Sequence, residues 1–268
     1  MARRWLIALA ATGFIALYLL WQNNHLTVTN YNVTTHDEEL EGVRIVQLAD
    51  LHHKSFGEDQ LRLEEKVLGL EPDLIVLTGD MVDGDVTDVE THLAFLGNLI
   101  DEAPIYAVSG NHEHTSDKMD DVRKVFDDLG VVLLENESRR VNVEDTSLEL
   151  HGVSDPVSFK SEEAYPEALP DASDDAFDIL LVHRPAYFDA YSDKDYDLVL
   201  SAHAHGGMFR LPFYGGIYAP DQGFFPAYTE GPYTEKGTTM ILSRGLGNSV
   251  IPFRIMNRPD IVLITLKS

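Results

Sequence analysis

Five short apolar runs, each followed at once by a polar cluster, constrain the fold of this 268-residue chain most strongly. Short apolar runs that end at Gly, Asp, Asn or His are typical of strands in a sheet covered on both faces. Such sheets collect functional side chains outside the carboxyl ends of their strands, so the clusters are expected to converge. The runs span residues 43–48, 74–77, 105–108, 179–182 and 198–200.

Seven side chains in these clusters are able to bind metal ions, namely Asp50, His52, Asp80, Asn111, His183, His203 and His205. The set mixes carboxylate and amide oxygens with imidazole nitrogens. Such a set suits Mn²⁺, Fe or Zn²⁺ better than Ca²⁺ or Mg²⁺, which prefer oxygen alone. Seven ligands exceed one tetrahedral site and match two ions that share a bridging carboxylate. The sequence predicts two divalent metal ions, with Mn²⁺ favoured and His112 left over.

In their order along the chain, these clusters resemble the motifs of the calcineurin-like metallophosphoesterases. The motifs are DLH at 50–52, GDMVD at 79–83, GNHE at 110–113, an isolated His183, and HAH at 203–205. The resemblance covers about residues 26 to 268. Its best local match is the membrane-associated bacterial YaeI/YkuE-type phosphodiesterase branch, through VQLADLH at 46–52, HGG at 205–207 and SRGLGNS at 243–249.

The resemblance implies a fold, a ligand set and a mechanism. The fold would be an α/β, four-layer αββα sandwich of two mixed sheets, preceded here by one transmembrane helix. His112 would be the catalytic histidine, with Asp83 behind it as an orienting partner. A hydroxide that bridges the metals would attack phosphorus while His112 protonates the leaving oxygen. One metal would be held by Asp50, His52 and His205, the other by Asn111, His183 and His203, with Asp80 as the bridge.

Three positions depart from the family pattern. Ala202 replaces the Gly before the last two histidines, and it would be strained if its backbone required a positive φ. Met208 replaces a common Gln. Gly84 stands where protein Ser/Thr phosphatases have Arg after Asp83, which argues against a specialist for phosphoproteins.

The net charge of −25 argues against a nucleic-acid surface, because phosphate binding needs clustered Lys and Arg. The absence of cysteine excludes disulfides, thiolate catalysis and Cys-ligated zinc. The family resemblance implies a phosphoester small molecule or a lipid-linked molecule as substrate, and the apolar N-terminal segment implies a membrane as a second partner.

Residues 5–21 form 17 consecutive uncharged residues with Trp5 and Trp21 at the ends. They reach roughly 26 Å as a helix, close to the thickness of a hydrocarbon core. No small-residue cleavage site follows and no charged face is present, so an uncleaved anchor is favoured over a signal peptide or an interfacial helix. The sequence predicts an anchor at 1–25 and one metallophosphoesterase domain at 26–268.

The charges beside the anchor predict its orientation. Arg3 and Arg4 precede the apolar run, whereas the next charged residues are acidic. The positive-inside rule then places a single-pass protein in the cell membrane with its catalytic domain outside the cytoplasm. The two arginines also resemble a twin-arginine export signal.

Outside the motifs, alternation over 26–35 predicts an edge strand, and apolar spacing predicts helices over 57–70, 87–99 and 116–129. Three strand runs at 131–134, 140–143 and 147–151 indicate a second sheet. His151 is expected to make a structural hydrogen bond. The acidic stretch 154–178 fits a solvated excursion or a lid, and the aromatic stretch 209–233 fits a wall of the active site.

Three functions compete. The first is a membrane-tethered phosphodiesterase or phosphomonoesterase. The second is a UDP-2,3-diacylglucosamine-type pyrophosphate hydrolase acting on a lipid precursor. The third is a non-catalytic metal-binding module of the same fold, which ranks last because every ligand and His112 are present.

Overall fold

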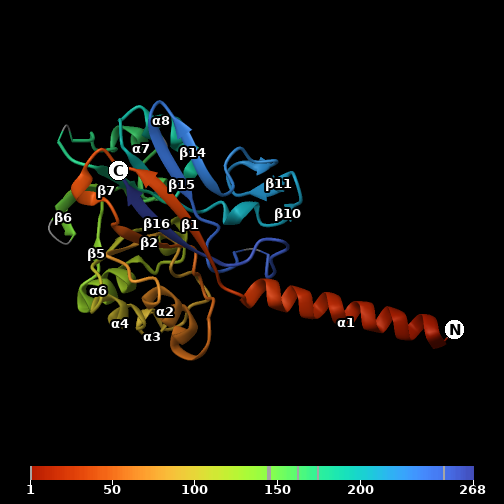
Figure 1. Ribbon diagram of the computed structural model, residues 1–268. Coiled ribbons are helices and arrows are strands. Elements are labelled where there is room, and N and C mark those ends of the chain that lie inside the picture. The colour runs from red at the N-terminus through yellow and green to blue at the C-terminus, as the bar shows by residue number, and fades with distance from the viewer. Residues whose placement is uncertain (1, 144–145, 162, 174, 250) are drawn as a thin grey trace.

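Two six-stranded mixed sheets pack face to face at the centre of the molecule (Figure 1). The computed structural model describes residues 2–143, 146–161, 163–173, 175–249 and 251–268. The first sheet has the order β1-β16-β2-β3-β4-β5 and the second the order β14-β15-β9-β8-β7-β6. The interface between them is an apolar core to which both sheets contribute, through residues such as Ile45, Val76, Ile179 and Leu200.

The five predicted strands are confirmed as buried, parallel strands at the middle of the two sheets. The first sheet contains β1 (Thr27–Thr34), β2 (Arg44–Leu48), β3 (Leu74–Thr78), β4 (Ile105–Val108), β5 (Val132–Leu133) and β16 (Asp260–Lys267). The second contains β6 (Glu137–Val143), β7 (Thr146–Gly152), β8 (Asp178–Leu181), β9 (Leu198–Ser201), β14 (Gly231–Glu235) and β15 (Thr238–Leu242).

Helices cover the outer faces of both sheets and complete the four-layer αββα sandwich that the sequence predicted. The first sheet buries its outer face under α2 (Leu61–Leu68), α3 (Val89–Leu93), α4 (Leu96–Ile100) and α6 (Met119–Leu129). The second is covered by α7 (Ala164–Glu167) and α8 (Phe188–Ser192), whose Tyr165 and Tyr191 are fully buried.

Four sequence-based boundaries needed correction. The helix predicted over 57–70 is α2, which begins at Leu61 because Asp59 and Gln60 have positive φ values of 50° and 63°. The helix predicted over 87–99 is two helices, because the hydrogen bonds at Ala94 and Phe95 shift to i+3 spacing. The helix predicted from residue 116 begins at Met119, since Asp117 has a φ of 57° and interrupts it. The run at 131–134 forms the edge strand β5 of the first sheet. Of the three runs that were expected in the second sheet, only the two that form β6 and β7 belong to it.

The aromatic stretch 209–233 and the acidic stretch 154–178 also contain regular secondary structure. Residues 209–233 carry two small hairpins, β10 (Arg210–Leu211) with β11 (Gly215–Gly216), and β12 (Tyr218–Ala219) with β13 (Gly223–Phe224). The acidic stretch contains α7 and the 3-10 turn η3 (Pro156–Ser158), while its residues 162 and 174 lie outside the described part.

The N-terminal helix α1 (Ala2–Asn24) extends away from the sandwich (Figure 1). Its apolar side chains are exposed; Trp5, for example, is 71% accessible. The helix is long and apolar enough to cross a membrane.

Candidate metal centre

The ends of the central strands bring the predicted ligands together. Asp50 follows β2, Asp80 follows β3, Asn111 follows β4, His183 follows β8, and His203 follows β9. Strands of both sheets therefore contribute ligands at one end of the sandwich, as the placement of the motifs predicted.

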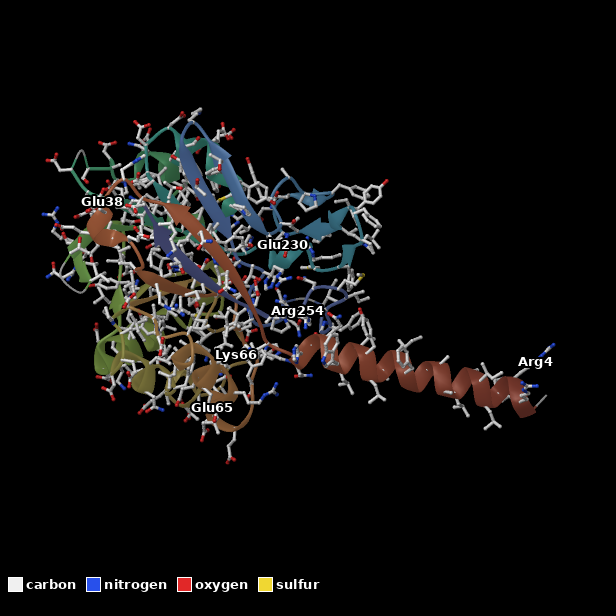
Figure 2. All side chains as sticks on the ribbon, viewed as in Figure 1. Arg4, Glu38, Glu65, Lys66, Glu230 and Arg254 are labelled. Atoms are coloured by element: carbon white, nitrogen blue, oxygen red, sulfur yellow. The ribbon has the colours of Figure 1, made fainter. Side chains whose placement is uncertain are left out.

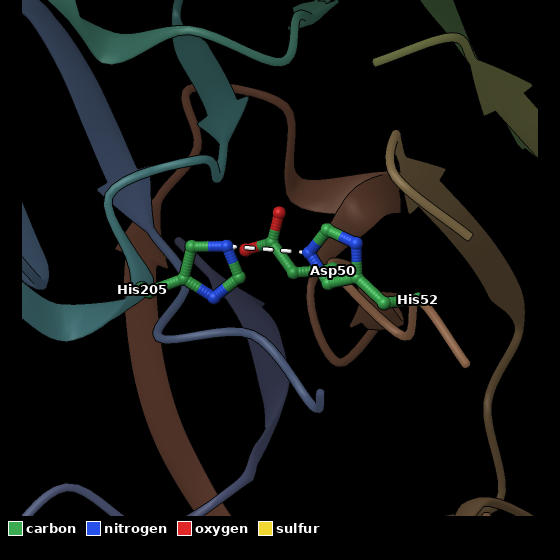
Figure 3. A group of neighbouring side chains, drawn as sticks. All are labelled: Asp50, His52 and His205. Atoms are coloured by element: carbon green, nitrogen blue, oxygen red, sulfur yellow. Dashed lines mark hydrogen bonds between the residues drawn. The ribbon is translucent and has the colours of Figure 1, made fainter. Parts of the chain in front are cut away.

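Asp50, His52 and His205 form the first ligand group (Figure 3). One donor atom from each residue lies within 4.8 Å of the others, and all three side chains are buried. The Nε2 atoms of His52 and His205 face each other at 3.3 Å. Two imidazole nitrogens aimed at each other in a buried site fit a shared cation, because two lone pairs alone would repel.

Asp80, His183 and His203 form the second group. Asp80 Oδ2 lies 3.1 Å from His183 Nε2, and His203 Nδ1 lies 3.1 Å from the same nitrogen. The same Asp80 oxygen lies 4.0 Å from His52 Nε2 of the first group. Asp80 thus stands between the two groups, which is the position that a bridging carboxylate requires.

Three buried oxygens of the ligands accept no hydrogen bond from any described residue, namely Asp50 Oδ2, Asp80 Oδ2 and Asn111 Oδ1. A buried acceptor without a donor costs free energy, so native proteins rarely leave one unpaired. Divalent cations would satisfy all three oxygens. The donor set of this chain therefore fits a metal centre on chemical grounds.

Hydrogen bonds to the other ring nitrogens orient two of the histidines. His183 Nδ1 donates to the carbonyl oxygen of Thr78 at 2.8 Å, which leaves Nε2 for a metal. His203 Nε2 lies 2.9 Å from Asp221 Oδ2, which leaves Nδ1. Metal-binding histidines usually hold their second nitrogen in this way, so that the tautomer and the ring orientation are fixed.

Backbone strain is present at most of the predicted ligands. Five of them have positive φ values between 47° and 67°: Asp50, His52, Asp80, His203 and His205. A left-handed conformation costs a residue with a side chain about 1–2 kcal/mol, and it persists where the surroundings over-determine it. Ala202 does not share this conformation, so the expected strain from losing Gly there is absent.

Three of the four histidine ligands are held neutral by burial, whereas at His183 burial is outweighed by the charge of Asp80, which raises the pKa to about 10, so a cation there would displace a proton. Burial lowers the pKa of His52 to about 4 and also lowers the pKa values of His203 and His205. These rings are therefore neutral near pH 7, which is the form that binds metal. Burial raises the pKa of Asp50 to about 7, and an adjacent cation would favour its carboxylate.

Glu113 is a structural member of the site that sequence reasoning did not assign. Its buried carboxylate accepts hydrogen bonds from backbone N–H groups of both metal-binding loops, those of Asp80 (3.1 Å), Met81 (2.6 Å), Val82 (3.3 Å) and Gly110 (2.9 Å). Glu113 ends the GNHE motif three residues after Gly110, a spacing at which a Glu side chain accepts from the N-cap backbone N–H, and this spacing was the available signal.

His112 is half-buried and lies beside the first ligand group. Its ring packs edge-on against His52 with a centroid separation of 4.7 Å, and its backbone N–H donates to Asp80 Oδ1 at 2.8 Å. No hydrogen bond to its imidazole is present among the described residues. One of its ring nitrogens lies within 4.8 Å of donor atoms of His52 and Asp80, so the position suits either a contact with substrate or a metal ion.

Asp83 takes a different place from the one expected beside His112. Its Oδ2 lies 2.7 Å from His53 Nδ1 and 3.6 Å from His52 Nδ1, and no hydrogen bond joins it to His112 within the described part of the chain. The hydrogen-bonded partner of Asp83 is therefore His53, whereas His52 Nδ1 is buried without a hydrogen-bond partner among the described residues.

A second network was not visible in the sequence. Arg184 binds Asp155 through two nitrogens, at 2.8 and 3.0 Å, and also contacts Asp221, the partner of His203. Asp221 lies in the turn between β12 and β13, which no motif marks. By contrast, the expected structural bonds of His151 are confirmed, to Ser138 at 2.7 Å and to Asp178 at 2.6 Å.

Comparison with known proteins agrees with this geometry. The family model for calcineurin-like phosphoesterases matches residues 43–207. The metallophosphoesterase YkuE of Bacillus subtilis (strain 168) is 33% identical over 234 residues, which cover 85% of this chain and 80% of YkuE. The phosphodiesterase YaeI of Escherichia coli (strain K12) is 29% identical over 230 residues, covering 83% of this chain and 82% of YaeI.

A relative from Danio rerio, a transmembrane protein with a metallophosphoesterase domain, is 28% identical over 292 residues, which cover 99% of this chain and 63% of the relative. The family match spans more than half of the chain and includes every predicted ligand. By its sequence motifs and by the site that they build, the chain belongs to the calcineurin-like phosphoesterases.

Proposed function

We propose that the chain is a membrane-tethered phosphoesterase that uses two divalent metal ions to hydrolyse phosphate mono- or diesters. The position of Asp80 carries this proposal, because one of its oxygens faces a histidine of each ligand group, at 3.1 and 4.0 Å. Asp50, His52 and His205 would hold one ion. Asn111, His183 and His203 would hold the other.

The bound ions would supply Lewis acidity toward phosphoryl oxygens and a nucleophile from water at neutral pH. Two residues of the chain have further roles in the proposed reaction. Glu113 fixes the two loops that carry Asp80 and Asn111. His112 presents an imidazole without a protein partner to the leaving oxygen, to which its protonated form would donate.

A second candidate function is hydrolysis of a pyrophosphate-linked lipid precursor of the UDP-2,3-diacylglucosamine type. The one local feature in its favour is Met208, an apolar side chain at a small cavity beside the ligand His205, at a position where the resembled family commonly has Gln. Polar side chains line the same cavity, namely Asn248, Ser249, Arg254 and Asn257.

An activity screen distinguishes these functions. Protein purified with Mn²⁺ should be assayed on bis-p-nitrophenyl phosphate, p-nitrophenyl phosphate and pyrophosphate-linked sugars. We expect turnover of the esters that is lost in Asp80→Ala and retained in Asp120→Asn, whose carboxylate is exposed on α6. Preference for the pyrophosphates would support the lipid-precursor function. A fully loaded protein that turns over none of them would support the non-catalytic module.

The N-terminal helix supports the proposed location. We propose that α1 forms a span and that the catalytic domain lies outside the cytoplasm, because Arg3 and Arg4 precede the apolar run and the next charged residues along the chain are acidic.

A further inference from the structure

Exposed apolar side chains gather in one region of the domain. Outside α1, ten large hydrophobic side chains of the described residues are exposed, and eight come from residues 211–225 and 253–256. Phe213 is 107% accessible, Tyr214 81%, and Phe224 and Phe225 73% each. The full set, here called the apolar face, is Leu211, Phe213, Tyr214, Tyr218, Phe224, Phe225, Phe253 and Met256. An apolar patch of this kind marks a surface that is covered in the working protein.

The apolar face is joined to the domain end of α1 by direct contacts. Asn23 donates to the carbonyl oxygen of Pro252 at 3.0 Å and accepts from the backbone N–H of Arg254 at 2.9 Å. Phe253 packs on Phe209, at the base of the first hairpin, with ring centroids 5.8 Å apart. The hairpins therefore sit beside the point where α1 enters the domain.

The apolar face also points in the direction that α1 takes. In Figure 1 the β10–β11 hairpin extends from the sandwich on the side where α1 leaves it, and in Figure 2 aromatic side chains project that way. In the view of Figure 1 the hairpins extend only part of the way along α1, and most of the helix lies beyond the domain. If α1 crosses a bilayer, the face meets that bilayer at its surface.

Cations surround the same junction, although the chain carries a net charge of −25. Lys54 Nζ donates to Asn24 Oδ1 and Arg62 donates to the Asn24 carbonyl, both at 2.9 Å. Arg258 lies over the ring of Trp21 at 5.0 Å. Lys and Arg beside Trp and Tyr are typical of the zone where a protein meets lipid headgroups.

We propose that the apolar face inserts into the headgroup–acyl boundary of the membrane that α1 spans, as a second contact between the domain and the bilayer. The proposal rests on the proposed span and is independent of the reaction. The proposal requires that lipid, and not a second copy of the chain, covers the aromatic side chains of the apolar face. Since the cavity at His205 shares Phe253 with this face, the metal centre then opens next to the membrane surface.

The absence of cysteine from the sequence permits a direct test. Phe213→Cys and Phe224→Cys in the full chain would each be labelled with an environment-sensitive fluorophore and reconstituted in vesicles of phosphatidylcholine and phosphatidylglycerol. Asn142→Cys is the matched control, because it is exposed on β6, at the edge of the sandwich away from α1 (Figure 1). We expect a blue shift at both test positions and loss of fluorescence with nitroxide-labelled lipid, but neither at position 142.

Two results would overturn the proposal. Labels at 213 and 224 that emit as in water would show that lipid does not cover the face. A blue shift that nitroxide lipid does not quench would assign the face to a second copy. Alkaline extraction of the same vesicles tests the span separately: a chain released by alkali would refute the span and the proposal together, without bearing on the phosphoesterase activity.

Discussion

At the scale of single residues, Asp80 is the side chain on which the two ligand groups both depend. Asp80→Ala should remove both ions, because its oxygen faces a histidine of each group, whereas Asn111→Ala should weaken mainly one. Elemental analysis of Mn²⁺-purified protein should show about two metals per chain in the wild type and in the Asp120→Asn control. A fully active protein with one tetrahedral Zn²⁺ would contradict the dinuclear centre.

His112 is predicted to act on the leaving group rather than to hold metal. His112→Ala should lower kcat by about 10²-fold or more while metal content stays near normal. The loss should shrink for esters with good leaving groups, because these need less protonation. Steady-state kinetics across leaving groups of different pKa provide the measurement, and an equal loss for all of them would argue against general-acid catalysis by His112.

At the scale of elements, the loops after β3 and β4 are held together by one carboxylate. Glu113→Gln would turn an NH₂ group toward backbone N–H donors that the carboxylate now satisfies. Each buried donor left unpaired costs about 1–3 kcal/mol, so we expect a lower Tm even in EDTA, and weaker metal binding.

Glu90→Gln on α3 is the matched control for that experiment, because Glu90 is exposed and should leave both quantities unchanged. Thermal unfolding in EDTA separates the structural effect from the metal. An unchanged Tm for Glu113→Gln in EDTA would show that the carboxylate does not hold the two loops.

The elements also show how far the sequence could predict this protein. The central strands and their ligands were predictable, because a buried parallel strand and the polar residues after it are adjacent in the chain. The roles of Asp221 and Arg184 were not predictable. Asp221 contacts His203 and Arg184 contacts Asp155, and in both cases the two segments come together only in the folded chain. The contacts of Asp83 were not predictable either, because its position in the motif does not show that its carboxylate faces His52 and His53.

At the scale of the whole molecule, placement across the membrane is the main prediction. In spheroplasts, or in intact cells of a host without an outer membrane, external protease should digest the domain or its tether while a cytoplasmic marker survives. The reason is the charge asymmetry around α1. Complete protection of the domain would place it in the cytoplasm and move the lipid-precursor function to first place.

The pairing of β1 with β16 has a consequence for how the protein is made. Thr27 lies opposite Asp260 in this pair, 233 residues further along the chain. β16 also separates β1 from β2, the strand that delivers Asp50. Such a distant pairing is slow to form and leaves strand edges uncovered in the meantime. During synthesis, β1 must wait for β16, so the first sheet is completed only late in folding.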